Sequence, residues 1–199
     1  MGGTRGGRRK ARQVGGRYLS GAPDGPICER MTNAIRILGI DPGLRHTGWG
    51  VITVQGSRLS HVAHGVIRPD ETLPLAARLM FLFDAVAAVI AEHQPHETAI
   101  EETFVNNNPS STLKLGHARA AAMIAPAKAG LIVAEYAATV VKKAVVGTGN
   151  ADKTQVAFMI KRLLPTAGDP KADAADALAV AIAHAHARTS PGARRGAAA

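Results

Sequence analysis

A fixed order of apolar segments between residues 35 and 187 constrains the fold of this chain more than any other feature. Short runs rich in β-branched residues predict strands, and longer segments with apolar residues at helical spacing predict helices. The predicted strands are 35–40, 48–55, 58–67, 98–102 and 131–136, and the predicted helices are 73–92, 112–128, 152–164 and 172–187. Three consecutive strands followed by strand–helix units predict an α/β fold with a mixed five-stranded sheet flanked by helices.

Two connecting segments carry further information. Gly56 and Ser57 separate the second and third predicted strands, which indicates a tight hairpin. Residues 140–146 mix β-branched residues with lysines, so their pattern assigns neither a strand nor a helix.

The two ends of the chain differ in composition from this central region. Residues 1–33 contain Gly-Gly pairs, clustered arginines and a turn-rich run at 21–26. Neither end can bury a core, so we expect a disordered basic arm over 1–33, one folded domain over 34–188 and a disordered tail over 189–199. Because Met31 lies just before the first strand, the arm is either native or the product of an upstream start assignment, and the sequence leaves both open.

Most of the positive charge lies in these two ends. The chain carries a net charge of +9, to which residues 1–33 contribute +5 and residues 191–199 contribute +2. Residues 34–190 hold 15 basic and 13 acidic residues. This distribution is compatible with a polyanionic partner but does not establish one.

The sequence favours a cytoplasmic location without membrane attachment. Cys28 is the only cysteine, which excludes a disulfide framework and suits a reducing cytosol. The arginine-rich N-terminus lacks the apolar stretch of a secretory signal; it shares an acid-poor composition with organellar transit peptides, but its glycines oppose an amphipathic helix. The apolar runs at 79–83 and 85–91 are too short to cross a bilayer.

Four acidic residues fall where binding sites form in α/β proteins. Asp41 ends the first predicted strand and Glu101 lies at the end of the fourth. Ligand sites of open α/β sheets gather at such carboxyl ends. Asp173 and Asp176 are three residues apart at the start of the last helix, so they share a face. Glu102 is the alternative to Glu101, but strand alternation points it to the opposite face.

These carboxylates would need a cation if they met in one pocket. Carboxylates a few ångströms apart raise one another's pKa, and a hard divalent cation removes the repulsion. All-oxygen ligation favours Mg²⁺ or Mn²⁺ over zinc. Two ions roughly 4 Å apart could activate a water and stabilise the leaving 3′ oxygen of a phosphodiester. Spacing alone does not prove that the acids converge, since each could equally be a solvated residue at a strand end or helix start.

Five motifs in a fixed order resemble the RuvC family of Holliday junction resolvases. They are ILGIDPG at 37–43 with TGWGVI at 47–52, AIEETF at 99–104, LKLGHARA at 113–120, VVGTGNADK at 145–153 and ADAADALA at 172–179. The match covers about 35–187 and leaves only the two ends uncovered. One such motif would be weak, whereas five in register are specific.

The resemblance implies an RNase H-like fold, a homodimer, and paired symmetric nicks in a four-way DNA junction during recombination and repair. The family's catalytic acids, which bind two Mg²⁺ ions per active site with Mn²⁺ as a substitute, correspond by motif position to Asp41, Glu101, Asp173 and Asp176. Family members work beside a branch-migration complex of the RuvA and RuvB type, which is therefore an expected partner.

Three further residues are DNA-binding candidates through the same resemblance. Phe104 matches the aromatic residue that helps open the junction and stacks on its bases, although a loop phenylalanine can also fold back onto the core. Lys142 and Lys153 match lysines near the cleaved phosphates, where fixed cations bind phosphate or stabilise developing charge.

Three other classes of protein stay open at this point. The turn at 41–43 is also similar to the first phosphate loop of actin-like ATPases, but a core of about 150 residues has no room for their second subdomain. A DNA-binding relative without catalysis would not need all four acids. A related nuclease acting on RNA is the closest enzymatic alternative, and Phe104, Lys142 and Lys153 favour the resolvase over it.

The histidines give no metal-binding pattern. His184 and His186 are two residues apart on a predicted helix and face different directions. His61 and His64 are three residues apart on a predicted strand, so regular alternation points them to opposite faces of the sheet.

Overall fold

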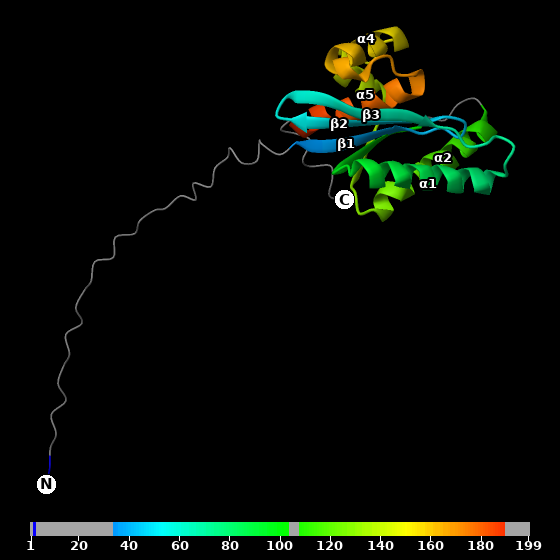
Figure 1. Cartoon of the computed structure of the whole chain (residues 1–199), viewed down its shortest axis with the longest axis horizontal. Helices are drawn as coiled ribbons and strands as arrows, with labels where there is room; N and C mark the ends of the chain where they lie inside the picture. Colours follow the sequence, from blue (N-terminus) through cyan, green and yellow to red (C-terminus); the bar gives the residue numbers. More distant parts are fainter. Residues whose placement is uncertain (1, 3–33, 104–107, 190–199) are drawn as a thin grey trace.

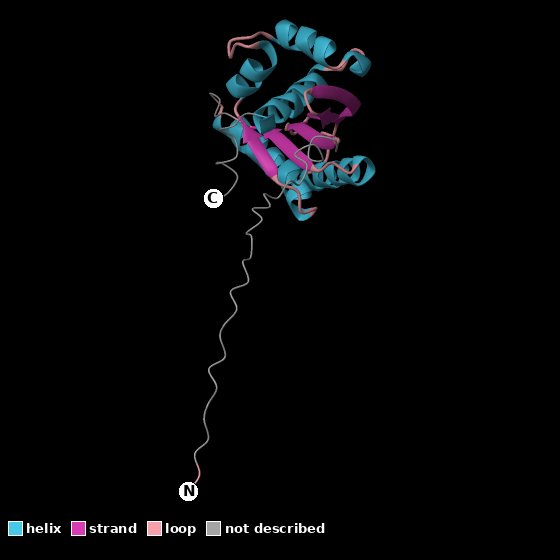
Figure 2. Ribbon diagram, turned by 90° about the vertical axis from the view of Figure 1, so that its left-hand side faces the viewer, coloured by secondary structure: helices cyan, strands magenta, loops and turns pink. Residues whose placement is uncertain are grey.

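The computed structural model describes residue 2 and residues 34–103 and 108–189, which form one sheet between two layers of helices (Figures 1 and 2). The predicted arm apart from Gly2, the tail after Thr189, and Phe104 lie outside the described residues. Within those residues, no helix is both long enough and apolar enough to span a membrane.

The described elements follow the predicted order. The strands are β1 (Ile35–Asp41), β2 (Thr47–Gln55), β3 (Arg58–Ile67), β4 (Glu97–Glu101) and β5 (Val133–Tyr136). The helices are α1 (Leu75–His93), α2 (Pro109–Lys128), α3 (Ala138–Val146), α4 (Lys153–Leu163) and α5 (Ala172–Thr189), with a short 3₁₀ helix, η2 (Pro165–Ala167), before α5. Each predicted strand and helix is confirmed to within a few residues.

The five strands form a mixed sheet in the order β3-β2-β1-β4-β5, as predicted. β2 pairs antiparallel with both β1 and β3, whereas β4 pairs parallel with both β1 and β5. Consequently β1, β3, β4 and β5 all end at the same edge of the sheet, which we call the carboxyl edge. Asp41 and Glu101 are the last residues of β1 and β4, so both lie at this edge.

The two faces of the sheet are covered by different helices. α1 and α2 pack on one face, and α5 packs on the other with α3 and α4 outside it (Figure 1). Alternation along β1 divides its side chains between two buried clusters: Leu38 and Ile40 pack with α1 and α2, and Ile37 packs with α5. α5 is buried on almost every side, which its alanine-rich sequence permits.

Three elements differ from the sequence patterns. Residues 138–146 form helix α3, because Val141 and Val145 share the buried face while the lysines between them point away from the core. α2 begins at Pro109, three residues earlier than predicted, because the Asn108 side chain caps it by accepting hydrogen bonds from the backbone of Ser110 and Ser111. η2 occupies part of the predicted loop after α4.

The prediction that His61 and His64 face opposite sides of the sheet is wrong. The register between β2 and β3 shifts at Val62, since Ile52 pairs with His61 whereas Val51 pairs with Ala63. This β-bulge adds one residue to β3 and reverses the alternation beyond it. The two imidazoles therefore lie on one face, with His61 Nε2 2.9 Å from His64 Nδ1.

Candidate active site

The parallel pairing of β1 with β4 places Asp41 beside Glu101. Ile40 lies opposite Ile100 in this pair, and both side chains are buried in the cluster beneath α1 and α2. The next residue on each strand therefore faces α5. Glu102 follows the end of β4, where its backbone N–H donates to the carbonyl of Tyr136.

Glycine residues in β1 and β2 bring α5 onto this part of the sheet. A Cβ atom on Gly48 would lie 1.8 Å from the carbonyl oxygen of Asp173, and one on Gly39 would lie 2.1 Å from that of Ala177. No other residue type permits so close an approach between helix and strand. Because Gly48 pairs with Asp41 across the β1–β2 ladder, the start of α5 lies directly over the end of β1.

The four predicted acids interact electrostatically. Burial, and after it the charges of Glu101, Asp176 and Asp173 in that order, together raise the pKa of Asp41 to about 8. Burial, and after it the charge of Asp176, raises the pKa of Glu101 to about 6. The pKa of Asp176 is also raised, mainly by burial and to a smaller extent by Asp173. The chain thus gathers carboxylates from three elements into a partly buried pocket that disfavours the charged forms of Asp41, Glu101 and Asp176.

Both predicted lysines reach this pocket. The Lys153 ammonium lies 3.6 Å from Asp176 Oδ2, and its charge lowers the pKa of Asp41, Glu101 and Asp176. Lys142 lowers the pKa of Glu101 and Asp176 from α3. Lys153 is the first residue of α4, which a capping box between Asp152 and Gln155 fixes in place.

The donor set suits a hard divalent cation, since every predicted ligand offers carboxylate oxygen. In the part of the chain that the structure describes, no three acidic, histidine or cysteine side chains are already arranged to hold a metal ion. The acids therefore share one charged pocket without forming a complete coordination shell by themselves. Glu102, the alternative to Glu101, is not among the charges that raise the pKa of Asp41.

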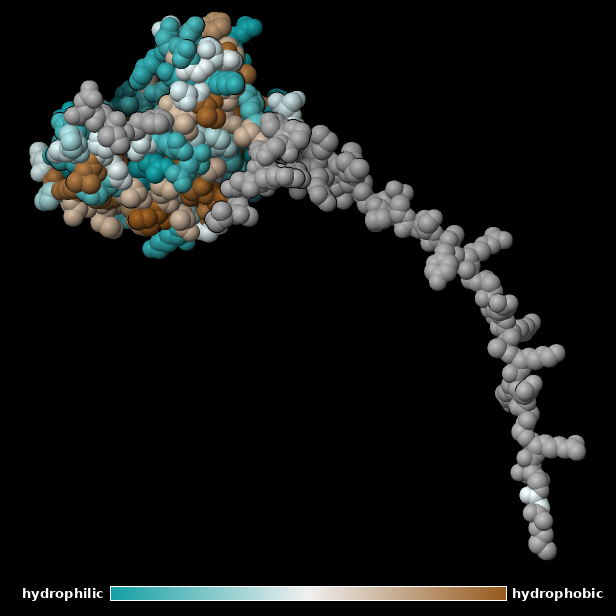
Figure 3. Space-filling model, turned by 180° about the vertical axis from the view of Figure 1, so that it is seen from behind, coloured by the Kyte–Doolittle hydropathy of each residue, from teal (hydrophilic) through white to brown (hydrophobic). Residues whose placement is uncertain are grey.

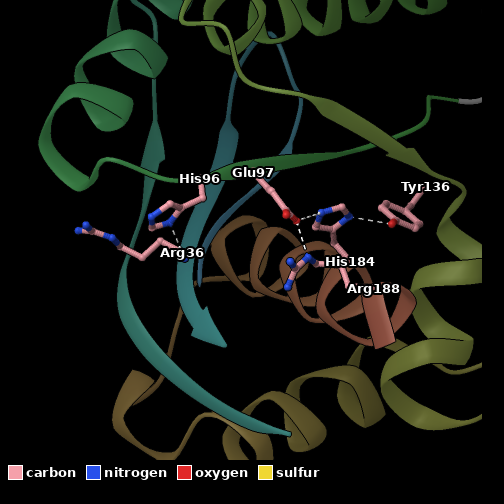
Figure 4. A network of polar contacts seen from close by, with 6 residues as sticks. All are labelled: Arg36, His96, Glu97, Tyr136, His184 and Arg188. Carbon is pink, nitrogen blue, oxygen red and sulfur yellow. Dashed lines mark hydrogen bonds and ion pairs between the residues drawn. The ribbon is translucent and has the colours of Figure 1, made fainter. Parts of the chain in front are cut away.

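A polar network that the sequence patterns did not reveal holds the far end of α5 (Figure 4). Glu97 Oε2 on β4 lies 2.8 Å from His184 Nε2 and 2.7 Å from Arg188 Nε on α5. Tyr136 on β5 hydrogen-bonds to His184 Nδ1 at 2.8 Å. His184 and Arg188 are four residues apart, and this spacing on a helix is the signal that could have predicted a shared partner.

The network fixes how α5 lies on the sheet. His184 is eight residues, or about 12 Å of helix, beyond Asp176. The hydrogen bond from His184, together with the positive charge of Arg188, holds the pKa of Glu97 below its ordinary value despite partial burial. α5 is therefore anchored at one end by this network and at the other by its contact with Gly48.

Comparison with protein families gives a match over the whole central region. The family model described as crossover junction endodeoxyribonuclease RuvC matches residues 37–184. A protein of that description from Caulobacter sp. (strain K31) is 69% identical over 154 residues, which cover 77% of this chain and 91% of that protein. Another from Rhodospirillum rubrum is 64% identical over 154 residues, with the same shares of coverage.

Two solved structures with similar folds are resolvases. Thermus thermophilus RuvC in complex with a Holliday junction substrate is 32% identical with a TM-score of 0.72, covering 76% of this chain and 93% of that one. The yeast mitochondrial Holliday junction resolvase has a TM-score of 0.57 over 82% of each chain, and at 13% identity it supports the fold alone. The RNase H-like fold expected from the sequence is thereby confirmed.

These matches distinguish between the classes of protein left open by the sequence. Neither an actin-like ATPase nor an RNA nuclease accounts for a resolvase family match over 37–184. The relatives at 69% and 64% identity are described as endonucleases, not as non-catalytic DNA-binding proteins. Nucleases of the matched family are metal-dependent, in agreement with the carboxylate-rich pocket. The chain belongs to the RuvC family of crossover junction endodeoxyribonucleases and is a nuclease that resolves Holliday junctions.

Proposed function

We propose that this chain cuts the junction by two-metal-ion hydrolysis, with Mg²⁺ held by Asp41, Glu101, Asp173 and Asp176. The raised pKa of Asp41, about 8, carries this proposal, because burial and three neighbouring acids produce it together. Divalent cations would make the charged forms of these acids tolerable at neutral pH. Mn²⁺ shares the preference for oxygen ligands and should substitute.

The residues of the chain have separate roles in this proposal. When bound, the two ions would supply an activated water and stabilise the leaving 3′ oxygen. The four carboxylates must be deprotonated to act as ligands, which Lys142 and Lys153 assist by lowering the pKa of their neighbours. Both ammonium groups could also bind the phosphate next to the cleaved bond. Phe104 stays a proposal on motif position, as the aromatic residue that stacks on junction bases.

The variant Asp176→Asn tests these roles. It keeps the shape of the side chain and removes its charge, so cleavage should fall at least about a hundredfold. Junction binding should persist, because affinity depends on cations and stacking rather than on this carboxylate. The measurements are nicking of a synthetic four-way junction in Mg²⁺ and a gel-shift assay in EDTA.

Asp84→Asn is the matched control, since Asp84 is an exposed residue of α1 on the opposite face of the sheet. This variant should cut and bind like the parent protein. Equal loss of binding and cleavage in a folded Asp176→Asn protein would contradict the proposed division of roles.

We infer further that the protein acts as a homodimer, because one chain offers one site and a symmetric resolution needs two cuts. The exposed face of α2 supports this inference. It carries the apolar or small residues Leu113, Gly116, Ala120, Ile124 and Ala127. Hydrophobic side chains gather over the lower part of the domain in Figure 3, where α1 and α2 lie in Figure 1. Leu113 and Ile124, which both lie in this stripe, are exposed at 63% and 56%.

The variant Ala120→Arg should place a charge in the middle of this stripe and produce a monomer in size-exclusion chromatography with light scattering. Paired nicks in one junction should then be replaced by single nicks. Ser57→Arg adds the same charge in the exposed hairpin after β2 and should leave the oligomeric state unchanged. A monomeric parent protein would refute the inference directly.

We also propose a cytoplasmic location and a branch-migration complex of the RuvA and RuvB type as partner. Both follow from membership of the family. Adding the RuvA and RuvB proteins of the same organism to the cleavage assay should raise the rate of resolution, and no change with any order of addition would count against the partnership.

A further inference from the structure

A groove of about 340 Å³ lies beside the acidic pocket, between the end of β3 and the chain that enters α5. Its walls include His64, Val66 and Arg68 on the β3 side and Asp169, Lys171 and Ala174 on the α5 side. The motifs that indicate a RuvC protein do not account for this groove.

The groove opens on the same face of the sheet as the acids. His64 pairs with Gly50, and Val66 pairs with Gly48, across the β2–β3 ladder. Both glycines pack directly against α5, at Leu178 and Asp173. Because paired residues of neighbouring strands share a face, His64 and Val66 also face α5.

The groove also lies at the same edge of the sheet as the acids. Arg68 follows Ile67, the last residue of β3, and so leaves the sheet at the carboxyl edge. β3 is two strands away from β1, which is about 10 Å at the usual spacing of strands. On the other wall, Lys171 precedes Asp173 by two residues. The groove is therefore next to the acidic pocket, so that one DNA strand a few nucleotides long could reach both.

The charges in the groove are mostly positive and uncompensated. Arg68 and Lys171 are exposed, and neither forms an ion pair with another described residue. Asp169, the acidic residue of the lining, pairs with Lys161 at 2.7 Å. By contrast, Arg45 at the same edge is already paired with Glu71 at 2.8 Å. Because Lys161 already neutralises Asp169, the positive charges of Arg68 and Lys171 in the groove have no negative partner among its described lining residues.

We propose that this groove binds backbone phosphate of the junction DNA, through Arg68 and Lys171, on the side of the acidic pocket opposite Lys142. Lys142 lies on α3, which directly follows β5, and β5 is on the opposite side of β1 from β3 in the strand order. The groove lies toward β3. A DNA strand that crosses the carboxyl edge would then meet cations on both sides of the acids, which holds the cleaved phosphate over them.

The test replaces both cations in the double variant Arg68→Gln/Lys171→Gln and measures junction affinity by fluorescence anisotropy in EDTA. Affinity should fall by about tenfold or more, as expected when charge-assisted hydrogen bonds are removed. The slope of log affinity against log salt should fall by about 1 for each phosphate that the variant no longer neutralises. Because EDTA is present, the result does not depend on the proposed metal ligands.

The matched control is Arg58→Gln/Lys128→Gln, which removes the same charge at the opposite edge of the sheet. Arg58 begins β3 and Lys128 ends α2. The charge-conserving variant Arg68→Lys/Lys171→Arg should retain most of the affinity. At saturating protein in Mg²⁺, the glutamine variant should still cut. An affinity and a salt slope equal to those of the control, in a folded protein, would overturn the proposal.

Discussion

Gly48→Ala is the most specific perturbation that the structure offers, because it should displace Asp173 without altering its side chain. The added Cβ would lie 1.8 Å from the carbonyl oxygen of Asp173, whereas Cβ atoms essentially never come within 3.0 Å of such an atom. The first turn of α5 therefore has to retreat by about 1.2 Å. A displacement of about 1 Å can lower a catalytic rate about a hundredfold, and the overpacking should cost about 1–3 kcal/mol of unfolding free energy.

The assay is single-turnover cleavage of a four-way junction in Mg²⁺, with the folded fraction measured by urea unfolding. Gly50→Ala is the matched control, two residues along the same strand and beneath the same helix. Its Cβ would approach Cδ2 and Cγ of Leu178 at 2.6 and 2.7 Å, whereas the nearest backbone atom, the N of Leu178, is 3.2 Å away. A side chain can rotate where a backbone carbonyl cannot, so α5 should move much less than in Gly48→Ala. Gly50→Ala should lose stability but keep cleavage. If Gly48→Ala cuts at the parent rate while folded, the close approach of α5 does not position Asp173 for catalysis.

Two other predictions concern the charges around α5. In the metal-free protein, the pKa of Asp41 rises from 3.8 to about 8 and that of Glu101 from 4.5 to about 6, so the folded state keeps protons that the unfolded chain releases. Stability should therefore decline as the pH rises from about 4 to about 8, and Mg²⁺ should raise Tm more at pH 8 than at pH 6; equal Tm shifts at both pH values would contradict this. His184→Ala should lower the unfolding free energy by about 1–3 kcal/mol, because it removes the hydrogen bonds to Tyr136 and Glu97; urea midpoints equal to the parent's would show that the network does not anchor α5.

The strands and helices could be predicted well from the sequence, because the spacing of apolar residues and the positions of Gly and Pro indicated the same element boundaries. α1 shows this agreement: its apolar residues repeat at helical spacing, and it ends at His93, with Gln94 as its C-cap before Pro95. α3 could not be assigned, since β-branched residues favour strands locally and only packing against α5 selects the helix. The bulge at Val62 was also beyond prediction, because one extra residue in a strand leaves no mark in composition.

The sequence could indicate the spatial arrangement of the predicted acids only in part, for a related reason. Residue order suggested that Asp41 and Glu101 end neighbouring strands, but their pairing depends on β4 lying beside β1. The contribution of α5 depends on Gly39 and Gly48, whose role in the packing of the helix is visible only when the helix is placed over them. The groove is formed by residues about one hundred positions apart, such as Arg68 and Lys171, so no short sequence motif could have predicted it.

The structure also explains how the fold stays intact although its acidic pocket disfavours the ionised forms of the carboxylates in it. Partly buried carboxylates at Asp41, Glu101 and Asp176 favour separation of α5 from β1 whenever they are ionised. That tendency is resisted by close packing of α5 on the sheet and by the ion pairs of Glu97 at its far end, both of which are independent of the acids. The helix can therefore hold two carboxylates in the pocket of the metal-free protein without leaving the sheet. The backbone that carries these ligands is then already ordered before a cation binds.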